Sequence, residues 1–295
     1  MAGKAQSGVT PVGDTRDILG EVPIWSVVEQ ALWWIDVRGP FLRRRDWASG
    51  ALQSWKVPEL VGCIAQCAGR PGLIVGLRSA VGFFDPATGA WERFPAPHAD
   101  APQMRFNDGK CDRQGRFWVG SMDDVGRRPI GTLYRFEAGH YTPVLDGIVV
   151  PNSLCWSPDG ATMYFADGID PVIWSFPFDT ATGNLGERRQ FVRLADGTGI
   201  PDGTTVDAEG YLWNAQYGGS VVTRYAPDGR VDRVIPVPVT QPTSCAFAGA
   251  DLSTLVITTA AQRLTPEALA RQPLAGALFA LPTNVRGLPE SQYAA

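Results

Sequence analysis

The sequence predicts an all-β fold, a six-bladed β-propeller with four-stranded antiparallel blades, and three observations support this fold class. A short β-rich run recurs six times along the 295 residues, at 32–37, 73–78, 117–122, 163–168, 212–217 and 255–260. The copies begin 41 to 49 residues apart, which is a period typical of propeller blades. The 33 glycines and 24 prolines suit a chain with many tight turns. We therefore expect one propeller domain over 1–295.

Each blade is predicted from the segments around one repeated run. A second strand follows the run and often ends on an Asp-Gly or Thr-Gly turn signal, and a further strand follows in most blades. A weakly polar segment precedes each run, and we expect it to be the innermost strand, beside the central channel. Residues 8–18 are expected to add the outer strand of the last blade and so remove an open edge. Residues 265–272 are the best helix candidate, and the tail 283–295 is expected to be loosely held.

The repeat also selects candidate site residues. Counting back 10 or 11 residues from each repeated run reaches six equivalent places, here called the ring positions: Glu21, Gly62, Asn107, Asn152, Asp202 and Ser244. In a propeller these should lie at one depth around one mouth of the channel. Oxygen-rich rings in a partly desolvated channel need a partner and commonly bind a cation. Asn-Asp-Gly at 107–109 and Pro-Asp-Gly at 201–203 are also common turn sequences, and any one of these residues alone is structural more often than not. Pro-Asp-Gly at 201–203 differs from its copies at 158–160 and 227–229 because it stands directly before an innermost strand.

Composition excludes several classes of function. The formal net charge of −4 and pI near 5.3 give no basic footprint for nucleic acid. No apolar run approaches the length of a membrane helix, so no membrane association is expected. Five cysteines without paired spacing are expected to be reduced thiols of a cytoplasmic protein. Only two histidines are present, which argues against a Ser–His–Asp hydrolase.

Five ordered segments resemble the SMP-30/gluconolactonase/regucalcin-like family of six-bladed propeller lactonases. The resemblance extends over roughly residues 18–282. It is carried by LGEVPIW at 19–25, RFNDGK at 105–110, GRFWVGSM at 115–122, PNSLCWSPDG at 151–160 and PDGTTVDAEG at 201–210. The chain departs from the family pattern at three places, with Val22 and Ser153 standing for glycines and Ser121 for a threonine.

The resemblance implies roles for individual residues. It implies metal ligation by Glu21, Asn152 and Asp202, and substrate contact by Arg105 and Asn107. It also implies an acidic residue shortly after the third repeated run. Asp123 and Asp124 are both candidates for that position, with Asp124 assigned to substrate binding.

The function expected on this basis is metal-dependent hydrolysis of a sugar lactone to the aldonic acid, in which the metal polarises the lactone carbonyl. One divalent ion is expected, Ca²⁺, Mg²⁺, Mn²⁺ or Fe²⁺; Zn²⁺ suits a site without His or Cys less well. Either Asp202 or metal-bound hydroxide would activate the attacking water. Tyr217 is a candidate to stack on the sugar, or a core aromatic. Arg127 and Arg128 are candidates to roof the channel.

Two other classes of function stay open. One is hydrolysis of another ester or a phosphotriester by the same kind of site. The other is a non-catalytic propeller that binds calcium or docks a protein. The oligomeric state does not follow from the sequence.

Overall fold

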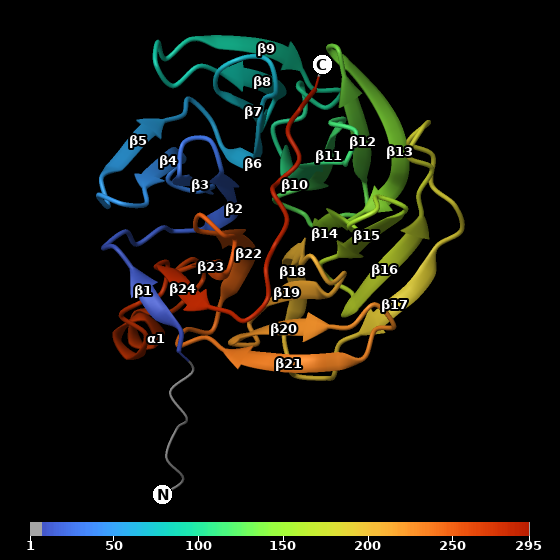
Figure 1. The fold of residues 1–295 in the computed structure, drawn as a ribbon. Helices are drawn as coiled ribbons and strands as arrows, with labels where there is room; N and C mark the ends of the chain where they lie inside the picture. Colours follow the sequence, from blue (N-terminus) through green and yellow to red (C-terminus); the bar gives the residue numbers. More distant parts are fainter. Residues whose placement is uncertain (1–7, 295) are drawn as a thin grey trace, which may run out of the picture.

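The structure, a computed structural model, describes residues 8–294 as six four-stranded antiparallel sheets arranged in a ring (Figure 1). The first three blades are β2 (Gly20–Ser26), β3 (Ala31–Asp36), β4 (Phe41–Asp46) and β5 (Leu52–Lys56); β6 (Val61–Gln66), β7 (Leu73–Leu77), β8 (Ala80–Phe84) and β9 (Trp91–Pro95); and β10 (Met104–Cys111), β11 (Phe117–Asp123), β12 (Gly131–Glu137) and β13 (His140–Ile148). The predicted six-bladed propeller is confirmed.

The remaining three blades complete the ring. They are β14 (Pro151–Trp156), β15 (Thr162–Asp167), β16 (Val172–Pro177) and β17 (Arg189–Arg193); β18 (Ile200–Val206), β19 (Leu212–Tyr217), β20 (Val221–Tyr225) and β21 (Val231–Pro236); and β22 (Pro242–Ala248), β23 (Thr254–Thr259), β24 (Leu278–Pro282) and β1 (Thr10–Val12). Each repeated run is the second strand of its blade, and the weakly polar segment before it is the innermost strand, as the sequence predicts.

The last blade is closed by the two ends of the chain. Strand β1 pairs antiparallel with β24, with Thr10 opposite Ala280 and Val12 opposite Leu278. The outermost strand of this blade, β1, therefore precedes its neighbour β24 by about 270 residues in the sequence. This pairing gives β24 a partner and removes an open sheet edge.

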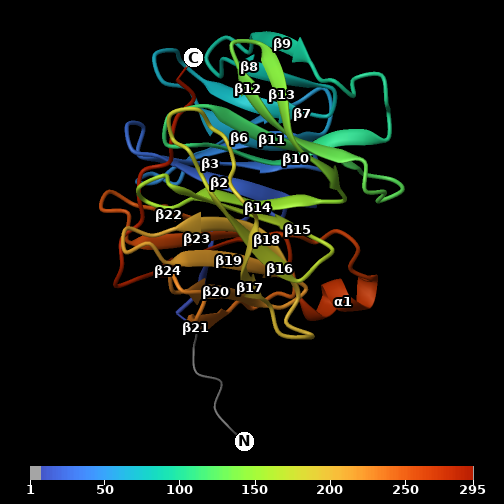
Figure 2. The same cartoon turned by 90° about the vertical axis from the view of Figure 1, so that its right-hand side faces the viewer.

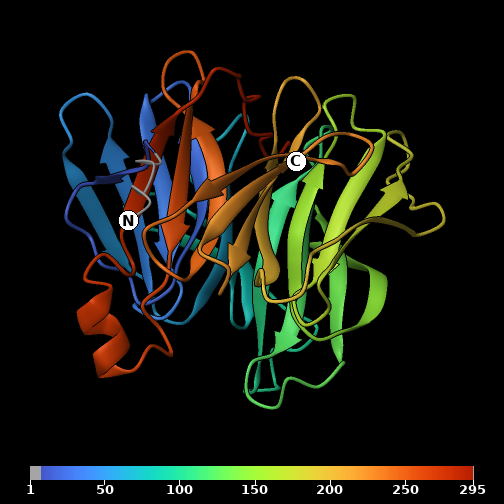
Figure 3. The ribbon, with the colours of Figure 1, turned by 90° about the horizontal axis from the view of Figure 1, so that it is seen from below.

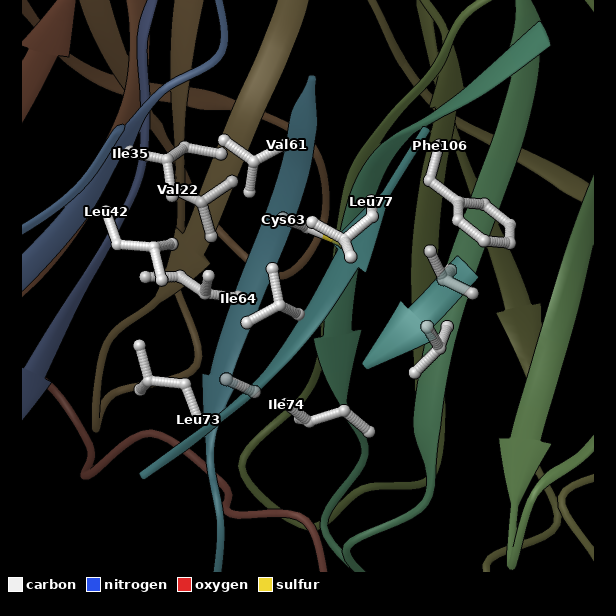
Figure 4. Packing of buried hydrophobic residues seen from close by; sticks show 14 of the residues in the cluster. Val22, Ile35, Leu42, Val61, Cys63, Ile64, Leu73, Ile74, Leu77 and Phe106 are labelled. Carbon is white, nitrogen blue, oxygen red and sulfur yellow. The ribbon is translucent and has the colours of Figure 1, made fainter. Parts of the chain in front are cut away.

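The blades pack face to face through apolar side chains. Figure 4 shows Ile35 and Leu42 of the first blade facing Ile64 and Leu73 of the second blade. On the other side of the second blade, Phe106 of the third blade belongs to the same buried cluster. The side chains of a strand point alternately to the two faces of its sheet. Both faces are buried here, because every blade packs between two neighbouring blades.

Among the described residues, 8–294, a single short α-helix lies outside the blades, α1 (Pro266–Arg271), within the predicted helical segment. Its N-cap is Thr265, whose hydroxyl accepts a hydrogen bond from the backbone N–H of Ala268 at 3.2 Å. Figures 2 and 3 place α1 and the C-terminal segment at opposite faces of the disc. The propeller thus has one face marked by α1 and another marked by the tail.

The prediction of a loosely held tail is wrong. The tail crosses the channel at the face opposite α1 (Figure 1), from Gly287, which bridges to Asp207, to Tyr293, which bridges to Cys67. Tyr293 is only 2% exposed, and its ring lies 5.4 Å from that of Phe83. A polar composition suggested a mobile end, but an aromatic anchor and backbone hydrogen bonds hold it.

Candidate active site at one mouth of the channel

The ring positions lie where the innermost strands are irregular. Every innermost strand shifts its register against the second strand near its ring position, at Glu21/Ile24, Val61/Cys63, Phe106/Gly109, Asn152/Cys155, Pro201/Thr204 and Pro242/Ser244. A β-bulge bends the strand and re-aims a side chain that regular pairing would direct out of one face of the sheet. The fold therefore turns the side chains of four ring positions, Glu21, Asn107, Asn152 and Asp202, toward one cavity.

Two of these bulges contain non-glycine residues in the left-handed backbone region, Val22 with φ of 47° and Ser153 with φ of 57°. These are the two positions at which the family pattern has glycine. Ser153 is anchored there, because its hydroxyl donates a 2.6 Å hydrogen bond to the backbone oxygen of Asp202. Val22 is β-branched, so this conformation is strained, and the packed surroundings of a buried side chain hold it.

A cavity of about 690 Å³, including its open mouth, occupies this end of the channel. Its volume is within the usual range for small-molecule sites. Six of the predicted site residues line it: Glu21, Arg105, Asn107, Asn152, Asp202 and Tyr217. Gly62 and Ser244, the ring positions without a strong ligand group, are not among its lining residues. The structure therefore brings the predicted polar residues together.

The floor of the cavity is acidic. Burial, then the nearby charges of Asp202 and Asp108, raises the pKa of Glu21 well above its ordinary value. Burial and the charge of Asp108 raise the pKa of Asp202 in the same way. Two buried carboxylates that disfavour each other's ionisation are stabilised by a cation placed between them.

Amide groups connect this floor to Arg105. The Arg105 Nη1 donates to Asn107 Oδ1 at 2.7 Å, and Asn107 Nδ2 donates to Asn152 Oδ1 at 2.8 Å. Asn107 Nδ2 also donates to the backbone oxygen of Pro151 at 2.9 Å. This chain fixes the orientation of the Asn152 amide, whose oxygen keeps a second lone pair for another partner.

Asp123 and Asp124 have different surroundings. Asp124 accepts two hydrogen bonds from Arg38, at 2.7 and 2.8 Å, and its Oδ1 lies 2.9 Å from Arg105 Nε. These guanidinium groups outweigh burial and hold the pKa of Asp124 well below its usual range. Asp124 does not line the cavity, so its contact is with Arg105. Asp123 is turned away and accepts from the backbone N–H groups of Val125 and Gly126 in the loop after β11.

The arginines of that loop also differ. Arg127 lines the cavity, whereas the Arg128 Nε donates to Asp123 at 2.5 Å and its side chain is 57% exposed. Of the two residues expected at the roof of the channel, only Arg127 lies there.

The residues present fit a divalent cation. Within residues 8–294 no three His, Cys, Asp or Glu side chains gather into a metal-binding group. The donor set is two carboxylates and one amide oxygen, from Glu21, Asp202 and Asn152. Hard oxygen donors of this kind suit Ca²⁺, Mg²⁺ or Mn²⁺, and two buried carboxylates with raised pKa values supply a reason for a cation.

Several cavity residues were not predicted from the repeat. They are Gln262 and Arg263, which follow β23, and the apolar Val150, Ile169 and Ile200. Arg38, which follows β3, contacts the site through Asp124. A signal for some of them is present, because Arg38, Ile169 and Arg263, like the predicted Arg127 and Tyr217, stand at or just beyond the end of a repeated run. These residues are found in the sequence by counting forward from the end of each repeated run, as the ring positions are found by counting back from its start.

The fold and this cavity define the chain as a six-bladed propeller with an enzyme-like site at one mouth of its channel. The chain belongs to the family described as SMP-30/Gluconolactonase/LRE-like region, whose pattern matches residues 19–261. The predicted family is thus confirmed, and with it the prediction of a lactonase-family enzyme. Within residues 8–294 no helix has the length and apolar character to cross a membrane.

Named relatives cover nearly the whole chain. A 6-deoxy-6-sulfogluconolactonase of Pseudomonas putida is 39% identical, over 94% of this chain and 95% of that protein. An L-arabinolactonase of Azospirillum brasilense is 36% identical, over 97% and 95%. A crystal structure of a calcium-binding protein, regucalcin, from Agrobacterium tumefaciens superimposes with a TM-score of 0.93 at 31% identity and covers 97% of each chain.

Proposed function

We propose that the chain is a divalent-cation-dependent hydrolase that opens a sugar lactone to its aldonic acid. The observation that carries this proposal is the convergence of Glu21, Asn152, Asp202, Arg105 and Asn107 on one cavity. The lactonase names of relatives at 36–39% identity support the substrate class. The calcium-binding regucalcin structure supports a cation of the hard, oxygen-preferring kind.

Glu21, Asn152 and Asp202 would hold the cation. When bound, it would polarise the lactone carbonyl and offset the negative charge that develops on the carbonyl oxygen. Of the metals considered, Ca²⁺, Mg²⁺, Mn²⁺ and Fe²⁺ suit the donor set, and Zn²⁺ suits it less because no His or Cys contributes.

Asp202 is the proposed general base. Its side chain lines the cavity, and burial with the charge of Asp108 raises its pKa above the ordinary carboxyl value, which makes it a stronger base than a solvent-exposed carboxylate. In the hydrolysis, Asp202 takes a proton from the attacking water as the water oxygen bonds to the carbonyl carbon. The bond to the ring oxygen then breaks, and that oxygen takes the proton from Asp202.

Arg105 and Asn107 are proposed to position the substrate. Asp124 and Asn107 fix the guanidinium of Arg105 from two sides, so its remaining donors have a defined direction toward sugar hydroxyls. Asp124 is therefore proposed as a positioning residue that acts through Arg105. The Tyr217 hydroxyl, which has no hydrogen-bond partner within residues 8–294, is proposed to contact the sugar.

The test is a panel of pentono- and hexonolactones assayed with and without a chelator. We expect hydrolysis of at least one lactone, loss of activity with chelator, and recovery with a divalent cation. Arg105→Ala should raise KM far more than it lowers kcat. Cation binding without turnover of any lactone would contradict the proposal and favour a binding module. Turnover of aryl esters or phosphotriesters alone would favour another hydrolase.

We also propose a cytoplasmic location. All five cysteines are free, and four of them are buried. Unpaired thiols in every blade that holds a cysteine suit a reducing compartment. The net charge of −4 supports a small-molecule partner over nucleic acid.

A further inference from the structure

We infer that the rim of this cavity is an anion subsite, formed by Arg127 and Arg263, that selects sugar lactones carrying an anionic group remote from the lactone carbonyl. Sulfonate, phosphate and carboxylate share the required chemistry, which is negatively charged oxygen atoms that accept from guanidinium groups. The lactone part of this statement rests on the proposed function. The anion subsite itself rests on the charges and contacts of the rim.

The rim carries more positive charge than the protein neutralises. Arg105, Arg127 and Arg263 line the cavity, and Arg38 lies beside them at Asp124. Three of these guanidinium groups, those of Arg38, Arg105 and Arg127, lie within ion-pair distance of the single carboxylate Asp124, and Arg263 adds a fourth positive charge, so the cluster carries three positive charges in excess. Glu21 and Asp202 on the floor do not change this balance once a divalent cation is bound between them. A cavity with this excess attracts anions and concentrates them at its mouth.

Asp124 is already in close contact with two other guanidinium groups. Arg38 occupies both of its oxygens at 2.7 and 2.8 Å, and Arg105 Nε lies 2.9 Å from one of them. Arg127 approaches Asp124 only to 3.9 Å. Within residues 8–294, no carboxylate oxygen forms an ion pair with Arg263. Two cavity-facing guanidinium groups are thus available to a ligand.

Arg127 and Arg263 come from loops of two different blades and face the same space. Arg127 follows β11 in the third blade, and Arg263 follows β23 in the sixth blade. Burial, and then the nearby charge of Arg263, lowers the pKa of Arg127, which reflects how close the two cations lie. An anion between them would relieve this repulsion.

Both arginines also have strained backbones. Their φ angles are 51° and 61°, in the left-handed region that non-glycine residues rarely adopt. Such strain is held where the surrounding structure defines a side-chain position tightly, and it clusters at ligand sites. The neighbouring Arg128 differs from both. It is not among the residues with a positive φ, its side chain is 57% exposed, and it is paired with Asp123.

The depths of the groups fix the orientation of the ligand. Asn152 and Asp202 are buried on the floor, whereas the Arg127 side chain is 31% exposed and Arg263 is exposed. Val150, Ile169 and Ile200 make the remaining wall apolar, which leaves the arginine rim as the place for a charged group. A lactone with its carbonyl at the floor therefore places a charge on its far end between Arg127 and Arg263.

The experiment compares gluconolactone with analogues bearing a 6-phosphate, a 6-sulfonate or a 6-carboxylate, using the full chain with its cation. We expect kcat/KM to be at least about 10-fold higher for one or more anionic substrates, because a charge-assisted contact has this magnitude. This preference should shrink as salt is raised. The double variant Arg127→Gln/Arg263→Gln should lose about 10- to 100-fold on the anionic substrate, and far less on gluconolactone.

Arg230→Gln is the matched control, because this residue is 67% exposed on a hairpin turn far from the cavity. It should leave the preference unchanged. The three anionic analogues separate strong-acid groups from carboxylates. Equal or better kcat/KM for gluconolactone would overturn the anion subsite and leave the proposed function standing.

A binding measurement separates the two hypotheses if no lactone is hydrolysed. In that case the proposed function fails, and 6-phosphogluconate is titrated against the full chain with and without the double substitution. Salt-sensitive binding that the double variant loses supports the anion subsite. Binding that is absent, or that is equal in both proteins, overturns it.

Discussion

The two mouths of the central channel are built from the same six strands and end in opposite ways. At one mouth, Glu21 and Asp202 are buried carboxylates whose mutual repulsion is left for a ligand to relieve. At the other, the tail crosses the opening, and Lys110 is paired with Glu290 at 3.3 Å. There, burial disfavours the charged ammonium group of Lys110, but nearby negative charges, that of Glu290 first, together outweigh burial and raise the pKa of Lys110. Polar groups that are paired within the protein are found at the mouth closed by the tail. Polar groups that still need a partner are found at the mouth with the candidate active site.

The largest expected effect comes from a substitution at the open mouth of the channel. Asp202→Asn should lower kcat by about 1,000-fold, because a neutral amide cannot accept the proton of the attacking water. Lactone hydrolysis at saturating cation measures it, with circular dichroism to check the fold. Glu290→Gln, at the closed mouth, is the control and should keep kcat within about twofold. Equal losses in the two variants would remove the distinction between the mouths.

The second largest effect comes from a substitution at the mouth that the tail crosses. Tyr293→Ala should destabilise the fold by about 3 kcal/mol, because a buried aromatic ring is removed from a packed site. Denaturant unfolding measures this change in the free energy of unfolding. At a temperature where the variant is folded, its kcat/KM should stay near that of the parent protein. A stable variant with lost activity would mean that the tail serves the chemistry.

The third effect concerns cation binding at the open mouth. Glu21→Gln should weaken divalent cation binding about 100-fold, since one of two charged ligands becomes neutral. Isothermal titration of the chelator-treated protein with Ca²⁺ and Mn²⁺ reads this directly. Substitution of Glu290 by Gln should leave the affinity unaltered. If Glu21→Gln binds as tightly as the parent, the cation lies elsewhere.

The smallest effect concerns pH. The folded pKa values of Glu21 and Asp202 are raised, so each group stabilises the fold below the ordinary carboxyl pKa near 4. That contribution is lost as the pH rises through the raised values. In chelator, the melting temperature of the parent should therefore fall with rising pH more steeply than that of Glu21→Gln/Asp202→Asn. Parallel pH profiles would show that the pKa values of these two carboxyl groups are not raised in the folded protein.

The period of the repeat could locate the innermost strands and the ring positions, because every blade obeys the same strand order. It could not locate the bulges, which depend on the pairing of two strands. The choice between Asp123 and Asp124 was out of reach for a similar reason. Their partners, Arg128 for one and Arg38 with Arg105 for the other, are brought to them by separate loops. Tyr293 packs against rings of two blades, Phe83 and Phe136, so its site exists only after folding.

The order of β1 and β24 in the chain has a consequence for synthesis. The strand that closes the ring leaves the ribosome before every other strand of the propeller, yet its partner, β24 at 278–282, is the last of these strands to be made. Five blades can form as the chain emerges, whereas the sixth must wait until β24 has left the ribosome, and the segment 283–294 docks after that. A chain that stalls late therefore keeps an exposed strand edge at each end of the open ring. Such an edge invites pairing with other chains, so only a completed product is protected from aggregation.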